Sequence, residues 1–445
     1  MHTLSVSPRL LGLVGFFVLL FVALAIVGKV PLKYNLRNLV VRWPITLLTV
    51  IVFLVVATLM TIMMAFINGM YRLTEGSAQP GNVVVLSDGA TDELFSNLGY
   101  GDTSDLERDP PNIQHDERGR PLASWELYLV VNQPVPDSSP VFKGGRRRRF
   151  LQLRGIDDPV LSARVHGLNL NPGGEWFSES SIRDDPAGGS DKVREALLGE
   201  GIARELGADV GKPSLQVGDT FGLGPRRWIV SGILTTGGTT FDSEIWAKRQ
   251  IVGPMFGKES SYTTLVLRTA DQHTADETAA WVTANFKKSA VQAQTERDYY
   301  EKLNGTNQQF LYVFVFVGVF TAIGGIFGVM NTMFAAISQR IKDIGVLRIL
   351  GFKRWQVLLS FFLETLLIAA IGGLIGVAVG SLANGWNMTS IAGSGNGGGK
   401  SIMFKLTVDA NIWLGVLTFS LGMGMLGGLL PALSALRLRA LESLR

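Results

Sequence analysis

The chain has 445 residues, no cysteine, and 41 basic against 37 acidic side chains, which gives a formal net charge of +4. The lack of cysteine excludes disulfides, thiolate metal sites and cysteine nucleophiles. Hydrophobic residues make up 47% of the chain and charged residues only 18%, a balance expected of a water-facing domain joined to a few membrane helices. The excess positive charge lies beside apolar segments, which indicates membrane topology rather than nucleic-acid binding.

Five segments contain about 20 mostly apolar residues, the length that a membrane-spanning helix requires. In the first of them, basic residues mainly follow the apolar run, the reverse of a cleavable signal peptide. We therefore expect residues 1–30 to form an extra N-terminal transmembrane helix, and residues 31–70 to form a cytoplasmic amphipathic segment and the second span. The five predicted spans are Leu10–Gly28, Pro44–Asn68, Phe310–Phe334, Val357–Gly380 and Ile412–Leu433.

The orientation follows from the basic residues, which accumulate on the cytoplasmic side of membrane proteins. If the N-terminus lies outside, alternation of the spans places residues 71–308 and the loop 381–411 outside as well. It places three basic segments inside: Pro31–Trp43, Ser338–Arg354 and the tail with Arg437, Arg439 and Arg445. The expected topology is therefore self-consistent and has a cytoplasmic C-terminus.

Residues 71–308 are long enough to form a domain with its own core. Short runs rich in β-branched and aromatic residues predict strands, and two other runs have helical periodicity. Turn signals separate these runs, so we expect an α-helical transmembrane bundle with a large α+β extracytoplasmic domain between spans 2 and 3. The predicted strands are Val83–Leu86, Glu126–Val131, Phe150–Leu153, Trp228–Leu234 and Tyr262–Leu267, and the predicted helices are Ala196–Leu206 and Asp276–Phe286.

Two glycine-rich stretches imitate nucleotide-binding motifs. Gly393–Ser401 resembles a phosphate loop, but it has Ser394 where the motif needs glycine and it follows a spanning helix. Gly422, Gly424 and Gly427 spell G-x-G-x-x-G inside the last span, where small residues serve helix packing. We interpret the first stretch as a flexible linker and expect no nucleotide at either place.

Neither a catalytic set nor a metal site is indicated. No Ser/His/Asp set or carboxylate pair is supported by a motif, so we expect a non-catalytic chain without a cofactor of its own. The run Arg146–Arg149 either contacts anionic lipid or a partner, or ends a solvated hairpin. The four histidines, which have no metal-ligand spacing, are His2, His115, His166 and His273.

The most informative stretch is Ser338–Arg354, which lies between two predicted spans and carries five basic residues against one acid. Ile341, Ile344, Leu347 and Leu350 recur at three-residue steps, close to the helical period. This pattern predicts a short amphipathic basic helix on the cytoplasmic side, which we interpret as a docking surface for a soluble partner.

Glu364 lies inside the fourth predicted span, where a carboxylate is unfavourable and tends to face protein or water. It is either a coupling or helix-interface site, or a boundary residue paired with Arg354 or Lys353. Glycines follow it at four-residue spacing and allow close helix packing, either within one chain or at a seam between two chains. These glycines are Gly372, Gly376 and Gly380.

The segment QRIKDIGVLRILGFKRWQVLLSFFLE resembles the signature of the MacB/LolC/FtsX family of ABC transporter permeases, and most closely its MacB/DevC-type branch. The sequences GLLPA at 428–432 and VGDT at 217–220 resemble further parts of that family. Two features depart from its pattern: the extra first span, and an aspartate in place of the usual glutamate of the coupling motif. The matching residues are Arg340, Asp343, Ile344, Gly345, Leu347, Arg348, Gly351 and Glu364.

The resemblance implies a permease domain over residues 309–445, in which the matching residues of 340–351 contact a separate cytoplasmic ABC ATPase. It also implies transmembrane coupling at Glu364, Gly372 and Gly376, and ATP and magnesium bound by the partner. A second permease chain, as a homodimer or heterodimer, and an extracytoplasmic adaptor are further implied partners. Such a protein of the bacterial inner membrane transmits movement (mechanotransmission) to export or extract a lipid, lipoprotein, glycolipid or peptide.

Three other functions stay open at this point. One is an FtsX-like regulator of cell-wall hydrolases, although that branch has a smaller outer domain. Another is a receptor or scaffold without a motor, which would not need a basic helix between spans. The third is a membrane-embedded enzyme with a catalytic Glu364, which would require further polar residues at the same depth.

Overall fold

The computed structural model describes most of the chain in seven ranges, together with a few single residues before residue 39. It divides into two compact units. The bundle unit comprises residues 1–69, 309–386 and 405–445, and the outer domain comprises residues 70–308 and 387–404. The described ranges are 39–99, 105–136, 148–186, 192–286, 290–303, 305–392 and 400–435.

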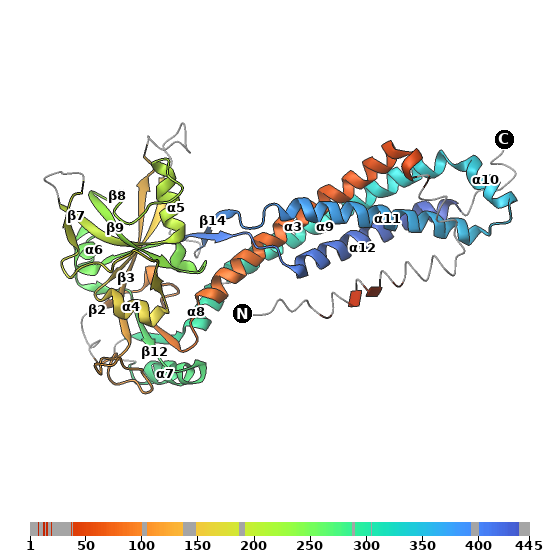
Figure 1. The fold of residues 1–445 in the computed structure, drawn as a ribbon. Helices are drawn as coiled ribbons and strands as arrows, with labels where there is room; N and C mark the ends of the chain where they lie inside the picture. Colours follow the sequence, from red (N-terminus) through yellow and green to blue (C-terminus); the bar gives the residue numbers. More distant parts are fainter. Residues whose placement is uncertain are drawn as a thin grey trace. The chain divides into compact units, whose positions relative to one another are not determined.

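Four helices in the described residues are long and apolar enough to cross a membrane. They are α3 (Trp43–Ser77), α9 (Gly305–Ser338), α11 (Arg354–Ser381) and α12 (Ala410–Ala435) (Figure 1). Four of the five predicted spans are thereby confirmed. The predicted first span, Leu10–Gly28, lies outside the described residues apart from isolated positions and stays a prediction.

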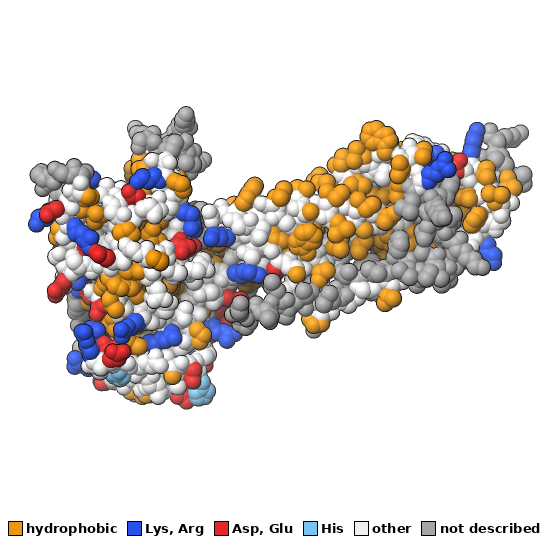
Figure 2. Space-filling view, in the orientation of Figure 1, with side chains coloured by type: hydrophobic (Ala, Val, Ile, Leu, Met, Phe, Trp, Pro, Cys, Tyr) orange, Lys and Arg blue, Asp and Glu red, His pale blue; other side chains and the backbone are white. Residues whose placement is uncertain are grey.

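The four helices differ in how much of their surface the chain itself covers. In the most apolar window of α11, 61% of the residues are buried, against 17% in α9. Hydrophobic side chains are spread over much of the described surface of the bundle unit (Figure 2), as expected where lipid replaces water as the solvent. Helix α11 is therefore the central helix of the bundle, and α9 lies at its periphery.

The predicted glycine stripe of α11 packs against α3 of the same chain. A Cβ atom at Gly376 would lie 2.6 Å from both the Ala57 Cβ and the Leu54 carbonyl oxygen. Gly372 and Gly380 make equally close approaches to α3, and the Thr58 hydroxyl donates a hydrogen bond of 3.0 Å to the Gly376 carbonyl. These glycines therefore close a seam within one chain.

A second seam joins α11 to α12. A Cβ atom at Gly424 would lie 2.6 Å from the Ala369 Cβ, and one at Gly428 would lie 2.8 Å from the Thr365 side chain. Gly427 faces Val329 of α9 in the same way. The G-x-G-x-x-G pattern of the last span thus serves helix packing at two of its three glycines.

The outer domain is built on a mixed sheet of eleven strands in the described residues. Its main path runs β13-β1-β12-β3-β4-β10-β7-β9-β5, with β6 paired to β7 and β8 paired to β9. All pairs are antiparallel except β4–β10 and β7–β9. The strands are β1 (Asn82–Ser87), β3 (Ala123–Pro134), β4 (Arg148–Ile156), β5 (Asn169–Leu170), β6 (Ile182–Asp184), β7 (Lys192–Gly199), β8 (Thr220–Leu223), β9 (Arg226–Thr235), β10 (Glu244–Lys248), β12 (Thr264–Arg268) and β13 (Val291–Thr295).

Two short strands, β2 (Leu98–Gly99) and β11 (Ser261–Tyr262), pair separately. Helices pack on the sheet, and the strands β4, β7 and β10 bury both of their faces. Leu198 and Ile245 pack with α5 and α6, whereas Leu197 and Trp246 pack with α4 and Phe241. The helices are α4 (Pro159–His166), α5 (Glu200–Asp209), α6 (Arg249–Met255), α7 (Gln272–Asn285) and α8 (Glu296–Leu303), with the short turns η1 (Glu93–Phe95) and η2 (Thr240–Ser243).

Four of the five predicted strands are confirmed, and the predicted helix Asp276–Phe286 lies within the longer α7 apart from its last residue. The fifth predicted strand, Tyr262–Leu267, is divided, because Tyr262 belongs to β11 and the main sheet takes only β12, from Thr264. The predicted helix Ala196–Leu206 is wrong in its first part, because β7 continues to Gly199 and α5 begins only at Glu200. A Cβ atom at Gly199 would collide with the Phe241 carbonyl, so the strand passes under η2 where only glycine fits. Good helix-forming residues are overridden here by sheet pairing with β10 and β9.

The segment expected to be an unstructured glycine-rich loop contains a β-hairpin. Strands β14 (Asn387–Ala392) and β15 (Lys400–Lys405) pair with each other. Gly393–Gly399, the centre of the phosphate-loop imitation, lies outside the described residues. The residues on both sides of this stretch are therefore paired strands, and the prediction of a flexible linker does not apply to them.

Candidate functional site

The predicted coupling segment contains one short helix, α10 (Ile341–Ile349), between α9 and α11. It is shorter than Ser338–Arg354 because α9 continues to Ser338 and α11 begins at Arg354. Gly351, with φ +97°, allows the turn between them. The backbone N–H of Lys353 then donates to the Gln356 side chain at 2.8 Å, which helps to start α11.

The apolar residues of α10 do not form the predicted stripe. Ile344 is buried in the core of the bundle with Ile337 and Val357, and Leu347 is half-buried. The exposed apolar side chains are Val346, Ile349 and Leu350, which are 48%, 65% and 71% exposed. Ile349 and Leu350 lie about one helical turn after Val346, and the three form an outward apolar face beside the basic residues, which we call the α10 face.

A buried ion pair lies at the base of α10. The Arg340 Nη1 and Nη2 atoms donate to the two carboxylate oxygens of Glu364 at 2.7 and 2.8 Å. Both residues are 4% exposed, and the guanidinium also lies 5.7 Å from the centroid of the Phe361 ring. The partner of Glu364 is therefore Arg340, and the alternative partners Arg354 and Lys353 are wrong.

This pair joins two elements that are adjacent in the chain but point in different directions. Arg340 immediately precedes α10, and Glu364 lies in the first half of α11. A bidentate arginine–carboxylate pair fixes both distance and orientation. The pair therefore fixes the start of α10 against the first half of α11, and breaking it from one side would leave a buried charge without a partner, which is strongly unfavourable.

A third element reaches the same place. The Arg42 side chain, just before α3, donates to the side chain and backbone of Gln339 at 3.3 Å. Its Nη2 atom also lies 3.5 Å from the Asp343 carboxylate in the first turn of α10. Asp343 is about half-exposed, so this contact is weak by itself. It nevertheless ties α10 to the start of α3.

The outer domain contains a larger buried charge cluster that the sequence analysis missed. Arg154 on β4 donates to Glu244 on β10 at 2.7 and 2.8 Å and to Glu93 of η1 at 3.2 Å. It also contacts the carboxylate of Glu126 on β3. All four side chains are at most 7% exposed. One guanidinium thus holds together three carboxylates from three elements.

His166, at the end of α4, extends this cluster. Its Nε2 atom lies 2.6 Å from the second carboxylate oxygen of Glu126, and its Nδ1 atom lies 3.8 Å from Glu296. Glu296 begins α8 and accepts hydrogen bonds from the Asn82 side chain at 3.0 Å and the Gln79 backbone at 2.9 Å. A continuous polar path therefore runs within the outer domain from β10 to the first residue of α8.

The cluster sets unusual pKa values. Burial alone would raise the pKa of Glu126, but the charges of His166 and Arg154 outweigh it and lower the pKa from 4.5 to about 2. Burial alone would lower the pKa of His166, but the charge and hydrogen bond of Glu126 raise it from 6.5 to about 10. The pair is therefore ionised at neutral pH and serves as a fixed structural contact.

The pH dependence of stability tests this ion pair. The folded state keeps the His166 proton up to about pH 10, whereas an unfolded chain loses it from about pH 6.5. Stability is therefore fully present below pH 6.5, and we expect the free energy of unfolding of the outer domain to fall as the pH rises toward 10. One proton corresponds to at most about 1.4 kcal/mol per pH unit. On the acid side, the Glu126 contribution is present above pH 4.5 and is lost as the pH falls toward 2.

The measurement is denaturant unfolding of the full chain in nanodiscs at pH 7, 8 and 9, followed by tryptophan fluorescence. His166→Gln should flatten the pH dependence, because glutamine keeps a hydrogen-bond donor but does not titrate. His273→Gln, at an exposed position of the same domain, should behave like the wild type. Equal pH slopes for His166→Gln and the wild type would contradict the ionised pair.

In the predicted run Arg146–Arg149, the two described arginines bind neighbouring groups of the outer domain. Arg146 and Arg147 lie outside the described residues. Arg148 binds the Asn132 side chain and backbone, and Arg149 pairs with Asp209 at 2.6 Å. In the part of the chain that the structure describes, no group of three His, Cys, Asp or Glu side chains could hold a metal ion.

Comparison with protein families agrees with this architecture. Residues 46–295 match the model of the MacB-like periplasmic core domain, which is more than half of the chain, and residues 315–440 match the FtsX-like permease C-terminal domain. The chain belongs to the MacB/FtsX-type ABC transporter permeases. The resemblance that the signature residues indicated is thereby confirmed.

Curated relatives include the macrolide export ATP-binding/permease protein MacB of Neisseria meningitidis, 22% identical over 393 residues. The alignment covers 83% of this chain and 56% of MacB, so the chain spans about half the length of such relatives. An uncharacterized ABC transporter permease of Methanocaldococcus jannaschii is 26% identical over 371 residues, with 78% of this chain and 88% of the relative covered.

Among solved structures, the chain is similar to the periplasmic region of MacB from Actinobacillus actinomycetemcomitans, at 14% identity and a TM-score of 0.34. That comparison covers 53% of this chain and 97% of the solved chain. It is also similar to the extracellular domain of the transporter YknZ from Gram-positive bacteria, at 16% identity and a TM-score of 0.31, with 48% and 99% covered.

The structure separates the signature residues of this permease into two groups. Arg340, Ile344 and Gly345 are buried, and Gly351 permits the turn after α10. Asp343, Leu347 and Arg348 are half-buried, and the α10 face is formed by residues that are not among the matching signature residues. Most signature residues therefore hold the segment in place against the bundle, and few of them lie on its exposed surface.

Proposed function

We propose that this chain is a permease subunit that couples ATP hydrolysis in a separate cytoplasmic ABC ATPase to movements of its outer domain. The observation that supports this most is α10 itself. It combines the outward α10 face, suited to docking, with a base fixed to the central helix α11 by the Arg340–Glu364 pair. A docking helix attached in this way passes its own displacement on to α11.

The proposed sequence of events begins at the motor. Closure of two ATPase subunits around bound ATP and magnesium displaces α10 in each of two permease chains. Arg340 passes the displacement to α11 and Arg42 passes it to α3. Helices α3 and α9 continue in the chain into the outer domain, where Glu296 of α8 begins the path through His166 and Glu126 to Arg154.

The setting follows from the same proposal. The chain lies in the bacterial inner membrane with α10 and the C-terminus in the cytoplasm, since the basic segments favour that side. The outer domain then acts on an extracytoplasmic lipid, lipoprotein, glycolipid or peptide, with or without an adaptor protein. This mechanotransmission needs no catalytic residue, metal or cofactor in the permease chain.

Co-purification tests the docking step. Ile349→Asp places a charge on the α10 face and should reduce the amount of ABC ATPase that co-purifies with the full chain by at least about tenfold. Lys342→Ser changes the net charge by the same amount at an exposed position of the same helix without altering an apolar side chain, and should retain the ATPase. The readouts are quantitative mass spectrometry and ATP turnover of the purified complex. A wild-type amount of ATPase on Ile349→Asp would reject docking at this face.

A further inference from the structure

A pocket of about 460 Å³ lies in the outer domain between the end of α3, the start of α7 and α8. Its volume falls within the range of about 300–1,000 Å³ that is usual for small-molecule sites. Thr74 and Tyr300 are buried at its lining. The charged side chains of the lining are exposed, so that they are open to a ligand. They are Glu75 on α3 and Arg297 and Glu301 on α8.

These three charged side chains have no partner in the part of the chain that the structure describes. None of them makes a hydrogen bond or an ion pair to another described residue. Arg297 and Glu301 lie four residues apart on α8, a spacing at which opposite charges can pair, and they still remain separate. One guanidinium and two carboxylates are therefore available to a ligand at the same pocket.

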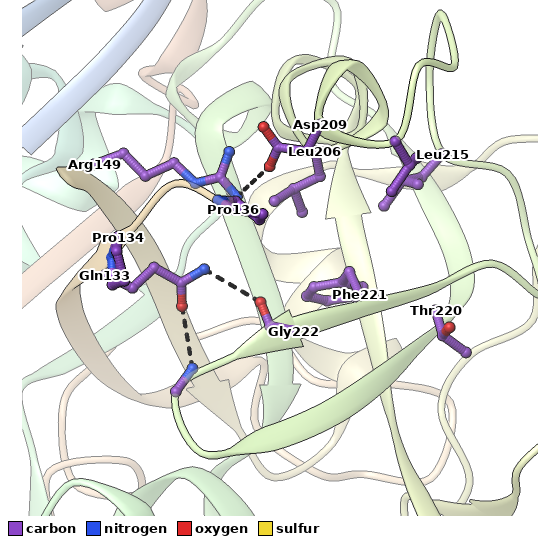
Figure 3. A pocket seen from close by; sticks show the side chains of 12 residues that line it. Gln133, Pro134, Pro136, Arg149, Leu206, Asp209, Leu215, Thr220, Phe221 and Gly222 are labelled. Atoms are coloured by element: carbon purple, nitrogen blue, oxygen red, sulfur yellow. Dashed lines mark hydrogen bonds and ion pairs between the residues drawn. The ribbon is translucent and has the colours of Figure 1, made fainter. Parts of the chain in front are cut away.

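A smaller pocket of the same domain, of about 240 Å³, has its charges already balanced (Figure 3). There the Arg149 Nη2 atom lies 2.6 Å from the Asp209 carboxylate. The Gln133 side chain donates to the Gly222 carbonyl at 3.2 Å and accepts from the Gly224 N–H at 3.1 Å. The polar groups of that pocket serve the domain itself, whereas those beside α8 are left for something else to bind.

The lining beside α8 suits a ligand that carries a cation and an anion together. Carboxylates accept hydrogen bonds from the N–H groups of a primary ammonium ion, and a guanidinium binds phosphate or carboxylate oxygens in a two-pronged contact. A phosphoethanolamine group carries these two charges at the ends of a short ethylene chain. It is therefore complementary to two carboxylates and one arginine.

The course of α3 indicates the membrane as the source of such a group. The helix continues without a break past Asn68, the end of the predicted second span, to Ser77. At 1.5 Å per residue, Tyr71 of the pocket lining lies about 5 Å of helix beyond Asn68, and Glu75 lies about 10 Å beyond it. The headgroup layer on each side of a bilayer is about 5–8 Å deep. This part of α3 is therefore within reach of lipid headgroups.

We propose that this pocket binds the headgroup of an aminophospholipid such as phosphatidylethanolamine. The ammonium group binds Glu75 and Glu301, and the phosphate binds Arg297. Because Glu75 lies on α3 and the other two residues lie on α8, the bound headgroup joins these two helices at the base of the outer domain. The site is independent of the proposed ATPase coupling, because it is tested on the permease chain alone.

Thiol labelling tests the proposal on the full chain in nanodiscs, since the chain has no cysteine of its own. Ala78→Cys places a thiol at a half-buried position of the lining, and Val217→Cys places one at an exposed position that does not line the pocket. Maleimide labelling rates are compared in phosphatidylcholine nanodiscs with and without phosphatidylethanolamine. Choline has the same charge but no N–H donor. Phosphatidylethanolamine should slow labelling of Ala78→Cys by about tenfold and leave Val217→Cys unchanged.

Variants in the Ala78→Cys background separate the pocket from general surface charge. Glu75→Gln/Glu301→Gln removes both carboxylates and should abolish the difference between the two lipids. Asp298→Asn removes an exposed carboxylate of the same helix that does not line the pocket, and should retain the difference. Arg297→Gln should raise the fraction of phosphatidylethanolamine needed for half-maximal protection. Because the replaced side chains are exposed and unpaired, all variants should keep the wild-type unfolding temperature, which is measured alongside.

Soluble glycerophosphoethanolamine separates a lipid headgroup from a free molecule of the same chemistry. Added to phosphatidylcholine nanodiscs, it should protect Ala78→Cys far more weakly than the lipid does. Protection by the soluble compound without protection by the lipid would assign the pocket to a free zwitterion and overturn the lipid ligand. Equal labelling rates of Ala78→Cys in the two lipids, or protection that survives Glu75→Gln/Glu301→Gln in a folded chain, would overturn the site itself.

Discussion

Replacing Arg154 by methionine is expected to unfold the outer domain under conditions in which the wild type is stable. The substitution leaves Glu93, Glu126 and Glu244 buried without their shared cation. Breaking one buried ion pair from one side typically costs about 3–5 kcal/mol, and here three carboxylates lose a partner at once. That loss is comparable to the whole stability of a typical domain, about 5–15 kcal/mol.

Thermal unfolding of the full chain in nanodiscs provides the measurement, with tryptophan fluorescence as the readout because Trp246 donates to Glu244 inside the cluster. Arg118→Met removes an exposed arginine of the same domain and should leave the unfolding temperature unchanged. Arg154→Lys should be intermediate, because lysine keeps the charge but not the planar fork that reaches several carboxylates. A wild-type unfolding temperature for Arg154→Met would show that the cluster does not stabilise the domain.

Neutralising one carboxylate should partly rescue the arginine variant. Glu244→Gln alone removes a charge that Arg154 needs and is expected to destabilise the domain. In the Arg154→Met background, Glu244→Gln removes a carboxylate charge that has already lost its partner. The double variant should therefore lose less stability than the sum of the two single variants. An additive loss in the double variant would place the two residues in separate interactions, contrary to the 2.7 Å contact.

Membrane-spanning segments could be predicted from the sequence because the bilayer requires only a certain length and an apolar composition. A helix must be about 20 apolar residues long wherever it crosses lipid, and α3, α9, α11 and α12 satisfy this without reference to any other residue. The glycine spacing of α11 likewise predicted that another helix packs closely on it. Which helix packs there could not be predicted, because nothing in the spacing distinguishes α3 of the same chain from a helix of a second chain.

The buried cluster could not be predicted, for a related reason. Each of the three neighbouring strands β3, β4 and β10 contributes two side chains that lie two residues apart on the same strand, and the register places all six on one face of the sheet. They are Glu126 and Tyr128 on β3, Gln152 and Arg154 on β4, and Glu244 and Trp246 on β10. In the sequence, such alternation of polar and apolar residues is typical of a face exposed to water. That face is instead covered by α4 and Phe241, a fact of tertiary packing.

The coupling segment shows the same division between local and tertiary information. The basic composition and the intervening position predicted a short helix between spans, and α10 is there. The side chains that face outward were misassigned, because a three-residue step drifts around a helix of 3.6 residues per turn. Glu364 was recognised as unusual, but the sequence favoured basic residues near the start of α11 as its partner, and the bend before α10 brings in Arg340 instead.

The Arg340–Glu364 pair leads to the second large expected effect. Glu364→Leu leaves the Arg340 guanidinium buried without a counter-charge, and we expect this to destabilise the bundle by about 3–5 kcal/mol. Glu364→Gln keeps one side-chain oxygen as an acceptor and should lose less. The double variant Arg340→Met/Glu364→Leu replaces the pair by apolar side chains of similar size, which is often neutral for stability. It should therefore fold and insert like the wild type.

The double variant separates a coupling role from a structural one. If the pair transmits movement, the complex of the double variant with its ATPase should assemble but show altered ATP turnover. ATP should also no longer change amide hydrogen exchange in the outer domain, at α8 and β10. If the pair only stabilises the bundle, restored stability should restore both readouts to wild-type values. Wild-type ATP turnover together with a wild-type exchange response in Arg340→Met/Glu364→Leu would therefore exclude this ion pair from the transmission path.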